Sequence, residues 1–181
     1  MTDQKRWKKE LEDLAEDYSQ LLLKIDGQKI FLKPEDGSWS LAELLYHVLL
    51  VNESYFPIFK GLIDRKFNQP FIARFEILAR FFGSHILTSV QPDNQRKTLT
   101  QSIWQPQNLE VPKDIVNLFF NSHSVLIEYI RKSWMYSDMG YVIHSPANRM
   151  IIYHLDTAIE IIIQHERRHL LQARKIAEKL V

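Results

Sequence analysis

Residues 149–180, RMIIYHLDTAIEIIIQHERRHLLQARKIAEKL, form the longest stretch that predicts an uninterrupted helix. Apolar residues recur in it every three or four positions, which is the period of one helix face. Polar side chains interrupt the middle of that face. Because a buried imidazole or amide needs a hydrogen-bond partner, the pattern indicates a helix with a polar site in the protein core. The predicted inward-facing residues are Ile151, His154, Ala158, Ile162, His165, His169, Gln172 and Ile176.

Three earlier stretches also predict long helices. In the first, apolar residues alternate at steps of four and three between charged ones. Ser40 and Glu43 form a capping box that starts the second, because each side chain accepts a hydrogen bond from the other residue's backbone. Pro112 suits the first turn of the third. Four long helices predict an all-α fold, a four-helix bundle. The predicted helices are approximately Asp3–Ile25, Ser40–Ile63, Pro112–Ser133 and Arg149–Leu180.

The segment between the second and third long helices, residues 64–111, is predicted to be an irregular insertion. Residues 71–87 have helical periodicity, and turns are expected at 91–94 and 104–106. Residues 135–148 are expected to form a loop. No repeat or linker divides the chain, so we expect one domain over residues 1–181. Four aromatic residues in the insertion suit an apolar pocket or, as we favour, the core: Phe71, Phe75, Phe81 and Phe82.

The composition excludes several classes of protein. The 181 residues carry 23 basic and 22 acidic side chains, a net charge of +1, whereas a nucleic-acid binder needs clustered positive charge. The chain has no cysteine, which excludes disulfide scaffolds, thiolate metal sites and cysteine nucleophiles. The polar N-terminus does not resemble a signal peptide, and no apolar stretch reaches the roughly 18 residues of a membrane span. We therefore expect a cytoplasmic protein with neither a nucleic-acid nor a membrane partner.

Histidines on the predicted inward faces suggest a metal site. His165 and His169 are four residues apart, so their rings project from neighbouring turns of one face and can bind the same ion. His47 lies about 60° from the centre of the apolar face of the second helix. Such imidazoles suit a divalent cation. The alternative is a set of core histidines whose nitrogens are satisfied by neighbouring side chains or water.

The letters His165-Glu166-Arg167-Arg168-His169 also match the H-E-x-x-H signature of zinc proteases, in which the glutamate is the general base. The extended form of that signature places a third histidine at position 175, where this chain has Lys175. The zinc protease is therefore a remote alternative. Any third ligand has to come from another helix, and His47 is the best placed candidate.

Several motifs together resemble the DinB/YfiT-like superfamily. They are the Trp39-Ser40 helix start, the inward-facing His47 that follows it, and the H-x-x-x-H-x-x-Q pattern of residues 165–172. The segment His144-Ser145-Pro146 is similar to a His-Pro loop of that family, with Ser145 inserted. The similarity extends over the whole chain in order and spacing, except for residues 64–111.

The resemblance implies a four-helix bundle, often a dimer, with a three-histidine site for nickel, zinc or a similar divalent ion. The implied ligands are His47, His165 and His169. Members include metal-dependent hydrolases and enzymes that transfer low-molecular-weight thiols. Three protein ligands leave a coordination position open, where water or a thiol loses its proton. We therefore expect a hydrolase or thiol S-transferase with a small-molecule substrate, and a homodimer.

Four further residues are candidates for the pocket. Gln172 lies one turn beyond His169 and is the first candidate to orient a ligand or bound water. Glu166, about 100° from the ligand face, is a possible base, although we favour a solvated surface charge. Arg168 is a weaker candidate for contact with an anionic substrate. His123 lies on the predicted inward face of the third helix, where a lone histidine is more often a structural residue. The competing hypothesis for the whole protein is a non-enzymatic bundle that binds metal or dimerises.

Overall fold

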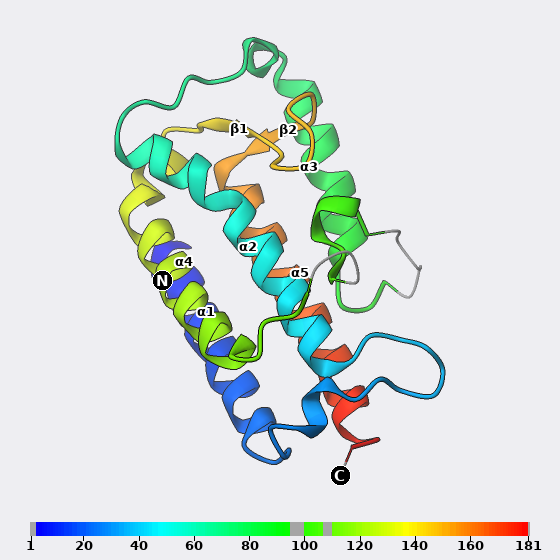
Figure 1. The fold of residues 1–181 in the computed structure, drawn as a ribbon. Coiled ribbons are helices and arrows are strands. Elements are labelled where there is room, and N and C mark those ends of the chain that lie inside the picture. Colours follow the sequence, from blue (N-terminus) through cyan, green and yellow to red (C-terminus); the bar gives the residue numbers. More distant parts are fainter. Residues whose placement is uncertain (1–2, 95–99, 107–109, 181) are drawn as a thin grey trace.

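The computed structural model describes residues 3–94, 100–106 and 110–180 (Figure 1). These residues form α-helices, two short strands and three single-turn 3₁₀ helices. No helix in the described ranges combines the length and apolar character that crossing a bilayer requires. The longer elements are α1 (Asp3–Leu22), α2 (Leu41–Ile63), α3 (Glu76–Val90), α4 (Ile115–Asp138), β1 (Val142–His144), β2 (Ile152–His154) and α5 (Leu155–Ala177), and the 3₁₀ turns are η1 (Lys29–Phe31), η2 (Phe71–Arg74) and η3 (Ser102–Trp104).

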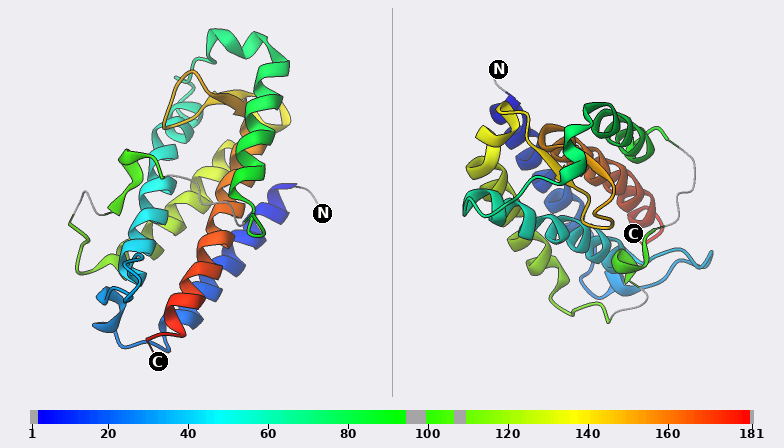
Figure 2. Two further views of the ribbon diagram at one scale, coloured as in Figure 1. Left: turned by 90° about the vertical axis from the view of Figure 1, so that its right-hand side faces the viewer. Right: turned by 90° about the horizontal axis from the view of Figure 1, so that it is seen from above.

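Helices α1, α2, α4 and α5 form the predicted bundle, and α3 packs outside it against α5 and β2 (Figures 1 and 2). The all-α prediction is confirmed. The apolar residues that recur along α1 lie on one face of the helix, and this face is buried in the core. They are Trp7, Leu11, Leu14 and Tyr18. This burial of apolar surface is the main stabilising contribution to the bundle. The stripe is consequently occupied within the chain itself.

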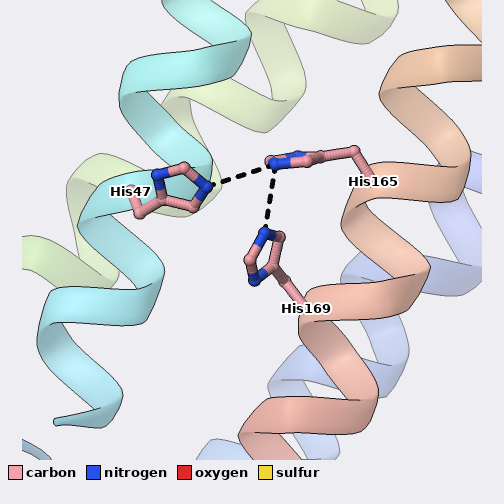
Figure 3. Close-up of side chains that lie close together, drawn as sticks. All are labelled: His47, His165 and His169. Carbon is pink, nitrogen blue, oxygen red and sulfur yellow. Dashed lines mark hydrogen bonds between the residues drawn. The ribbon is translucent and has the colours of Figure 1, made fainter. Parts of the chain in front are cut away.

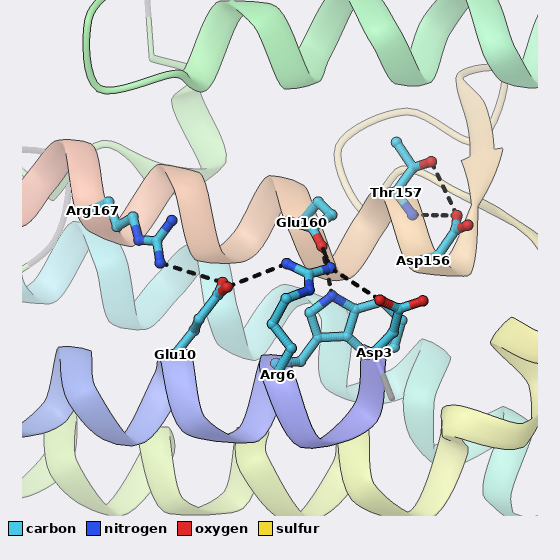
Figure 4. A network of polar contacts seen from close by, with 8 residues as sticks. Asp3, Arg6, Glu10, Asp156, Thr157, Glu160 and Arg167 are labelled. Carbon is cyan, nitrogen blue, oxygen red and sulfur yellow. Dashed lines mark hydrogen bonds and ion pairs between the residues drawn. The ribbon is translucent and has the colours of Figure 1, made fainter. Parts of the chain in front are cut away.

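Polar contacts join α1 to α5 at the edge of this core (Figure 4). The carboxylate of Glu160 accepts hydrogen bonds from the Arg6 guanidinium and from the Trp7 indole, the latter at 2.6 Å. One turn further along α1, Glu10 lies 3.3 Å from the Arg167 guanidinium. These contacts hold α1 along the side of α5 that carries Glu160 and Arg167.

The capping box at the start of α2 forms as predicted. Ser40 Oγ accepts a hydrogen bond from the Glu43 backbone N–H at 3.1 Å, and the Glu43 carboxylate accepts one from the Ser40 backbone at 2.9 Å. The helix then continues through Pro57 to Ile63. Because the cap defines the first residue of α2, it also sets the position of His47 two turns into the helix.

The prediction that the last helix begins at Arg149 is wrong, because α5 begins at Leu155. The residues before it, Ile152–His154, form an antiparallel pair with Val142–His144, in which Ile143 lies opposite Tyr153. β-branched and aromatic residues favour strands, and the partner strand satisfies their backbone groups. As a result His154 does not lie on the helix face, and its Nε2 lies 3.0 Å from the Glu76 carboxylate.

The other differences lie at element ends and in the insertion. α4 begins three residues after Pro112 and continues to Asp138, so residues 135–148 are not one loop. The insertion contains η2, α3 and η3, and part of the predicted turn at 104–106 lies in η3. Three of the aromatic residues favoured for the core are instead 56–70% exposed, because α3 has the bundle on one side only: Phe71, Phe75 and Phe81. Phe82, by contrast, packs against a small buried cluster around Ala79.

Candidate metal centre

Three histidines from two helices meet between α2 and α5 (Figure 3). His47 comes from α2, and His165 and His169 come from successive turns of α5. The Nε2 atom of His165 lies 3.2 Å from that of His47 and 3.1 Å from that of His169. In the part of the chain that the structure describes, this is the one group of three such side chains close enough to share an ion. The structure therefore brings together the three residues that were predicted from the sequence as metal ligands.

The spacing of the nitrogens suits a divalent transition metal. Bonds of about 2.0–2.1 Å from two imidazoles to one ion place the nitrogens about 2.9 Å apart at a right angle and about 3.3 Å apart at a tetrahedral angle. The two observed separations, 3.2 and 3.1 Å, lie between these values. Neutral imidazole is also a preferred ligand of zinc and nickel. The group can hold such an ion.

The three Nε2 atoms do not carry enough protons to form hydrogen bonds at every contact between them. His47 Nδ1 lies 2.8 Å from the carbonyl oxygen of Trp104. A carbonyl only accepts, so Nδ1 carries the proton and Nε2 of a neutral His47 has a bare lone pair. His165 Nε2 contacts both other rings, yet a neutral ring has at most one proton there to donate. At least one lone pair is left without a full partner, a deficit that a bound cation removes.

The electrostatic surroundings keep these histidines neutral. Burial lowers the pKa of His165 well below its usual value, and the neighbouring His169 and His47 lower it further. Burial also lowers the pKa of His169 to about 3, an effect that Gln172 opposes. For His47, burial lowers the pKa and the hydrogen bond to Trp104 acts in the opposite direction. Uncharged rings at neutral pH are the form that binds metal.

The three histidines differ in how deeply they are buried. The Trp39 ring lies against His47, with 5.0 Å between ring centroids. His47 and His169 are buried, whereas the side chain of His165 is partly exposed. The Nδ1 atoms of His165 and His169 have no hydrogen-bond partner among the described residues.

Glu166 is completely buried, so the interpretation of it as a solvated surface charge is wrong. Its carboxylate accepts a hydrogen bond from Asn52 Nδ2 at 2.7 Å and lies 2.9 Å from His123 Nε2. The Tyr18 hydroxyl donates to its backbone oxygen. The helical wheel placed Glu166 away from the ligand face correctly, but α1, α2 and α4 cover that side of α5 as well. Its carboxylate is thus engaged in the core, which does not fit the role of a protease general base.

The remaining candidates are placed as follows. His123 lies with Glu166 and not with the three histidines. Arg168 donates to the backbone oxygen of Ser89 at 2.8 Å and so joins α5 to α3. Gln172 lies close enough to His169 to affect its pKa. The sequence analysis missed the Trp104 carbonyl, since no side-chain pattern marks a backbone acceptor. It also missed Asn52, a polar residue among the apolar ones of α2, which was a usable signal.

A comparison with protein-family models agrees with this architecture. The model of the DinB superfamily matches residues 10–173, which include all three histidines, the whole of α2 and α4, and most of α1 and α5. Searches of curated proteins and of solved structures found no match.

Proposed function

This chain belongs to the DinB superfamily, and we propose that it is a metal-dependent enzyme in which His47, His165 and His169 bind one divalent cation, nickel or zinc. The observation that supports this most strongly is the convergence of three Nε2 atoms that lack enough protons to satisfy one another. A purely structural role would call for a hydrogen bond at each of these Nε2 atoms, and the protons available do not supply one.

The proposed reaction is hydrolysis, or transfer of a low-molecular-weight thiol to a small electrophilic substrate. A divalent ion with three imidazole ligands keeps a coordination position open, and there it lowers the pKa of a bound water or thiol. The chain's part is to hold the ligands. The Trp104 carbonyl fixes the tautomer of His47, so that Nε2 is the free ligand atom.

The supporting residues follow from their contacts. Gln172 is the candidate to orient a group bound beside His169. Arg168 already contacts the Ser89 backbone, so we assign it the role of joining α5 to α3. Glu166 is engaged by Asn52 and His123, so we assign it no proton transfer.

A second candidate is a metal-binding bundle without catalysis. One observation favours it: His47 and His169 are buried, which restricts the approach of a substrate to the ion. Metal content alone does not separate the two candidates, whereas turnover does.

The test is elemental analysis of tag-free protein incubated with nickel or zinc and then desalted. We expect about one equivalent of ion in the wild type and in His85→Ala, an exposed histidine elsewhere, and none in His165→Ala. Loaded protein is then assayed with an activated ester for hydrolysis, and with a thiol and an activated aryl halide for transfer. Absence of metal from the wild type contradicts both candidates. Metal without turnover on either probe favours the non-catalytic bundle.

A further inference from the structure

A cavity that is open to solvent lies at the end of the bundle where α2 ends. It has a volume of about 420 Å³, within the usual range for small-molecule sites. The segment that follows α2 and the turn between β1 and β2 lie at this same end (Figures 1 and 2). The segment after α2 supplies Lys66, Phe67 and Asn68 to the lining, the end of β1 supplies His144, and the turn supplies Arg149. Helix α2 itself supplies Pro57 and Gly61.

This cavity is separate from the three histidines. Pro57 and Gly61 lie ten and fourteen residues beyond His47 on the same helix. At 1.5 Å per residue they are about 15–21 Å further along the axis. A ligand in the cavity therefore does not reach a metal ion at His47. The segment His144-Ser145-Pro146, which the proposed metal site does not use, contributes His144 to the lining.

The charge of the cavity is positive. Lys66 and Arg149 are both exposed, and neither forms an ion pair in the described ranges; Asp64, which is paired with Lys60, is close enough to Lys66 to interact with its charge. None of the lining residues is acidic. The end of α2 alone accounts for Lys66, since a cation is favoured near helix carbonyls. It does not account for Arg149, which the β1–β2 turn brings in from a distant part of the sequence.

The backbone holds Lys66 and Phe67 in place. Arg65 has a φ of 57°, a left-handed conformation that glycine normally adopts at the end of a helix. This turn lets the backbone N–H groups of Lys66 and Phe67 both donate to the Gly61 carbonyl, at 2.8 and 3.0 Å. These two hydrogen bonds hold the backbone of Lys66 and Phe67 against the end of α2.

The cavity also has an aromatic wall with a free polar atom. The Phe67 and His144 rings lie 6.0 Å apart between centroids at an angle of 32°. His144 Nδ1 donates to the Ser145 carbonyl at 3.0 Å, which leaves Nε2 available for a ligand. Two cations, an amide from Asn68 and an aromatic surface are the groups that bind a small organic anion.

We propose that this cavity binds a small organic anion, whose carboxylate or phosphate group is held by Lys66 and Arg149 and whose apolar part contacts Phe67. The binding is independent of the proposed metal site. Charge-assisted contacts to exposed side chains are individually weak, so the affinity is in the millimolar range and falls as salt rises.

The test is titration followed by amide shifts in two-dimensional NMR, with three probes of similar shape: phenyl phosphate, benzoate and neutral benzyl alcohol. We expect saturable shifts of the Phe67 and His144 amides with one or both anions up to about 10 mM, and none with the alcohol. Lys66→Ala and Arg149→Ala should each weaken binding about two- to fivefold, and the matched control Lys24→Ala should leave it unchanged.

The same titration of His165→Ala distinguishes this site from anion binding at a metal ion, since the shifts should persist there. A response to phenyl phosphate alone identifies the ligand group as a phosphate, and a response to benzoate identifies a carboxylate. The proposal is overturned if the anions give no saturable shifts at these amides, if the alcohol binds equally well, or if the two substitutions have no more effect than Lys24→Ala.

Discussion

His47 and His165 are 118 residues apart in the sequence, and their Nε2 atoms lie 3.2 Å apart between α2 and α5. The inward position of each histidine has a local cause. A cap defines the start of α2, and the apolar periodicity of α5 defines its buried face. The short distance between them depends on how the two helices are placed against each other. Properties of the site are therefore sensitive to packing changes that do not touch a histidine.

Metal binding should stabilise the wild-type protein. A ligand that binds only the folded state at about 100 times its Kd adds about 2.7 kcal/mol. For a chain of this size that raises the Tm by roughly 5–10 °C. We expect this rise on addition of zinc or nickel to the wild type and to His85→Ala, and no rise for His47→Ala, measured by differential scanning fluorimetry. An equal rise in His47→Ala would show that the ion binds elsewhere.

Glu166 should be important for stability. Glu166→Ala leaves Asn52 and His123 without their buried partner, a kind of loss that costs about 3–5 kcal/mol. Urea unfolding measures this cost. The control is Glu178→Ala, an exposed glutamate near the end of the chain, for which we expect less than about 0.5 kcal/mol. A small effect of Glu166→Ala would contradict the buried network.

The pair of Glu166 and His123 should also make stability depend on pH. Burial lowers the pKa of His123, but the charge of Glu166 and the hydrogen bond to it outweigh this effect, so its pKa is raised above 6.5. A raised pKa in the folded state contributes stability that is complete below the unfolded value of 6.5 and is lost as the pH rises through the folded value. The difference in unfolding free energy between the wild type and His123→Gln should therefore decrease toward alkaline pH. The metal-site histidines are present in both proteins, so their contribution to the pH dependence of the unfolding free energy cancels to first order in the difference. A difference that is constant with pH would count against a charged His123.

Gly83 allows α3 to approach α5 closely. A Cβ atom at this position would lie 2.9 Å from Thr157 Cγ2 and 3.2 Å from Tyr153 Cβ. Gly83→Val should destabilise the protein by about 1–3 kcal/mol through overpacking. Thr157→Ser removes the nearest methyl group, so Gly83→Ala should be more favourable in that background than in the wild type, as a thermal double-mutant cycle can measure. Gly27→Ala, with open space around it, is the control. Additive effects would show that the contact does not limit the packing.

The exposed face of η2 and α3 is where we expect a second copy of the chain to bind. Phe71, Phe75, Ile77 and Phe81 are 70%, 56%, 82% and 61% exposed. They offer roughly 400–650 Å² of apolar surface, which is about half to four fifths of the about 800 Å² that each partner contributes to a stable interface. Light scattering after size exclusion should give a dimer mass for the wild type.

Ile77→Lys should convert that dimer to a monomer. Leu23→Lys, at a site 76% exposed on another part of the surface, should leave it intact. A monomeric wild type, or a dimer that survives Ile77→Lys, would place the partner surface elsewhere.

The local features of the chain could be predicted from its sequence because their causes are local. The capping box at Ser40 and Glu43 depends on residues three apart, and the neighbouring positions of His165 and His169 depend only on helical period. The apolar stripes predicted the bundle for the same reason. The β1–β2 hairpin was missed since Ile152 and Tyr153 suit both a helix and a strand, and the choice depends on pairing with Val142 and Ile143.

The sequence by itself thus determines the helices, the bundle and the histidines on its inner faces, because hydrophobic period and capping act between near neighbours. Only the tertiary structure brings His47 to His165, buries Glu166 beside His123 and leaves α3 exposed. It also aims the Trp104 carbonyl at His47. These outcomes depend on which helix covers which face. Contacts between residues far apart in the chain decide this, and the helical wheel of one helix contains no information about them.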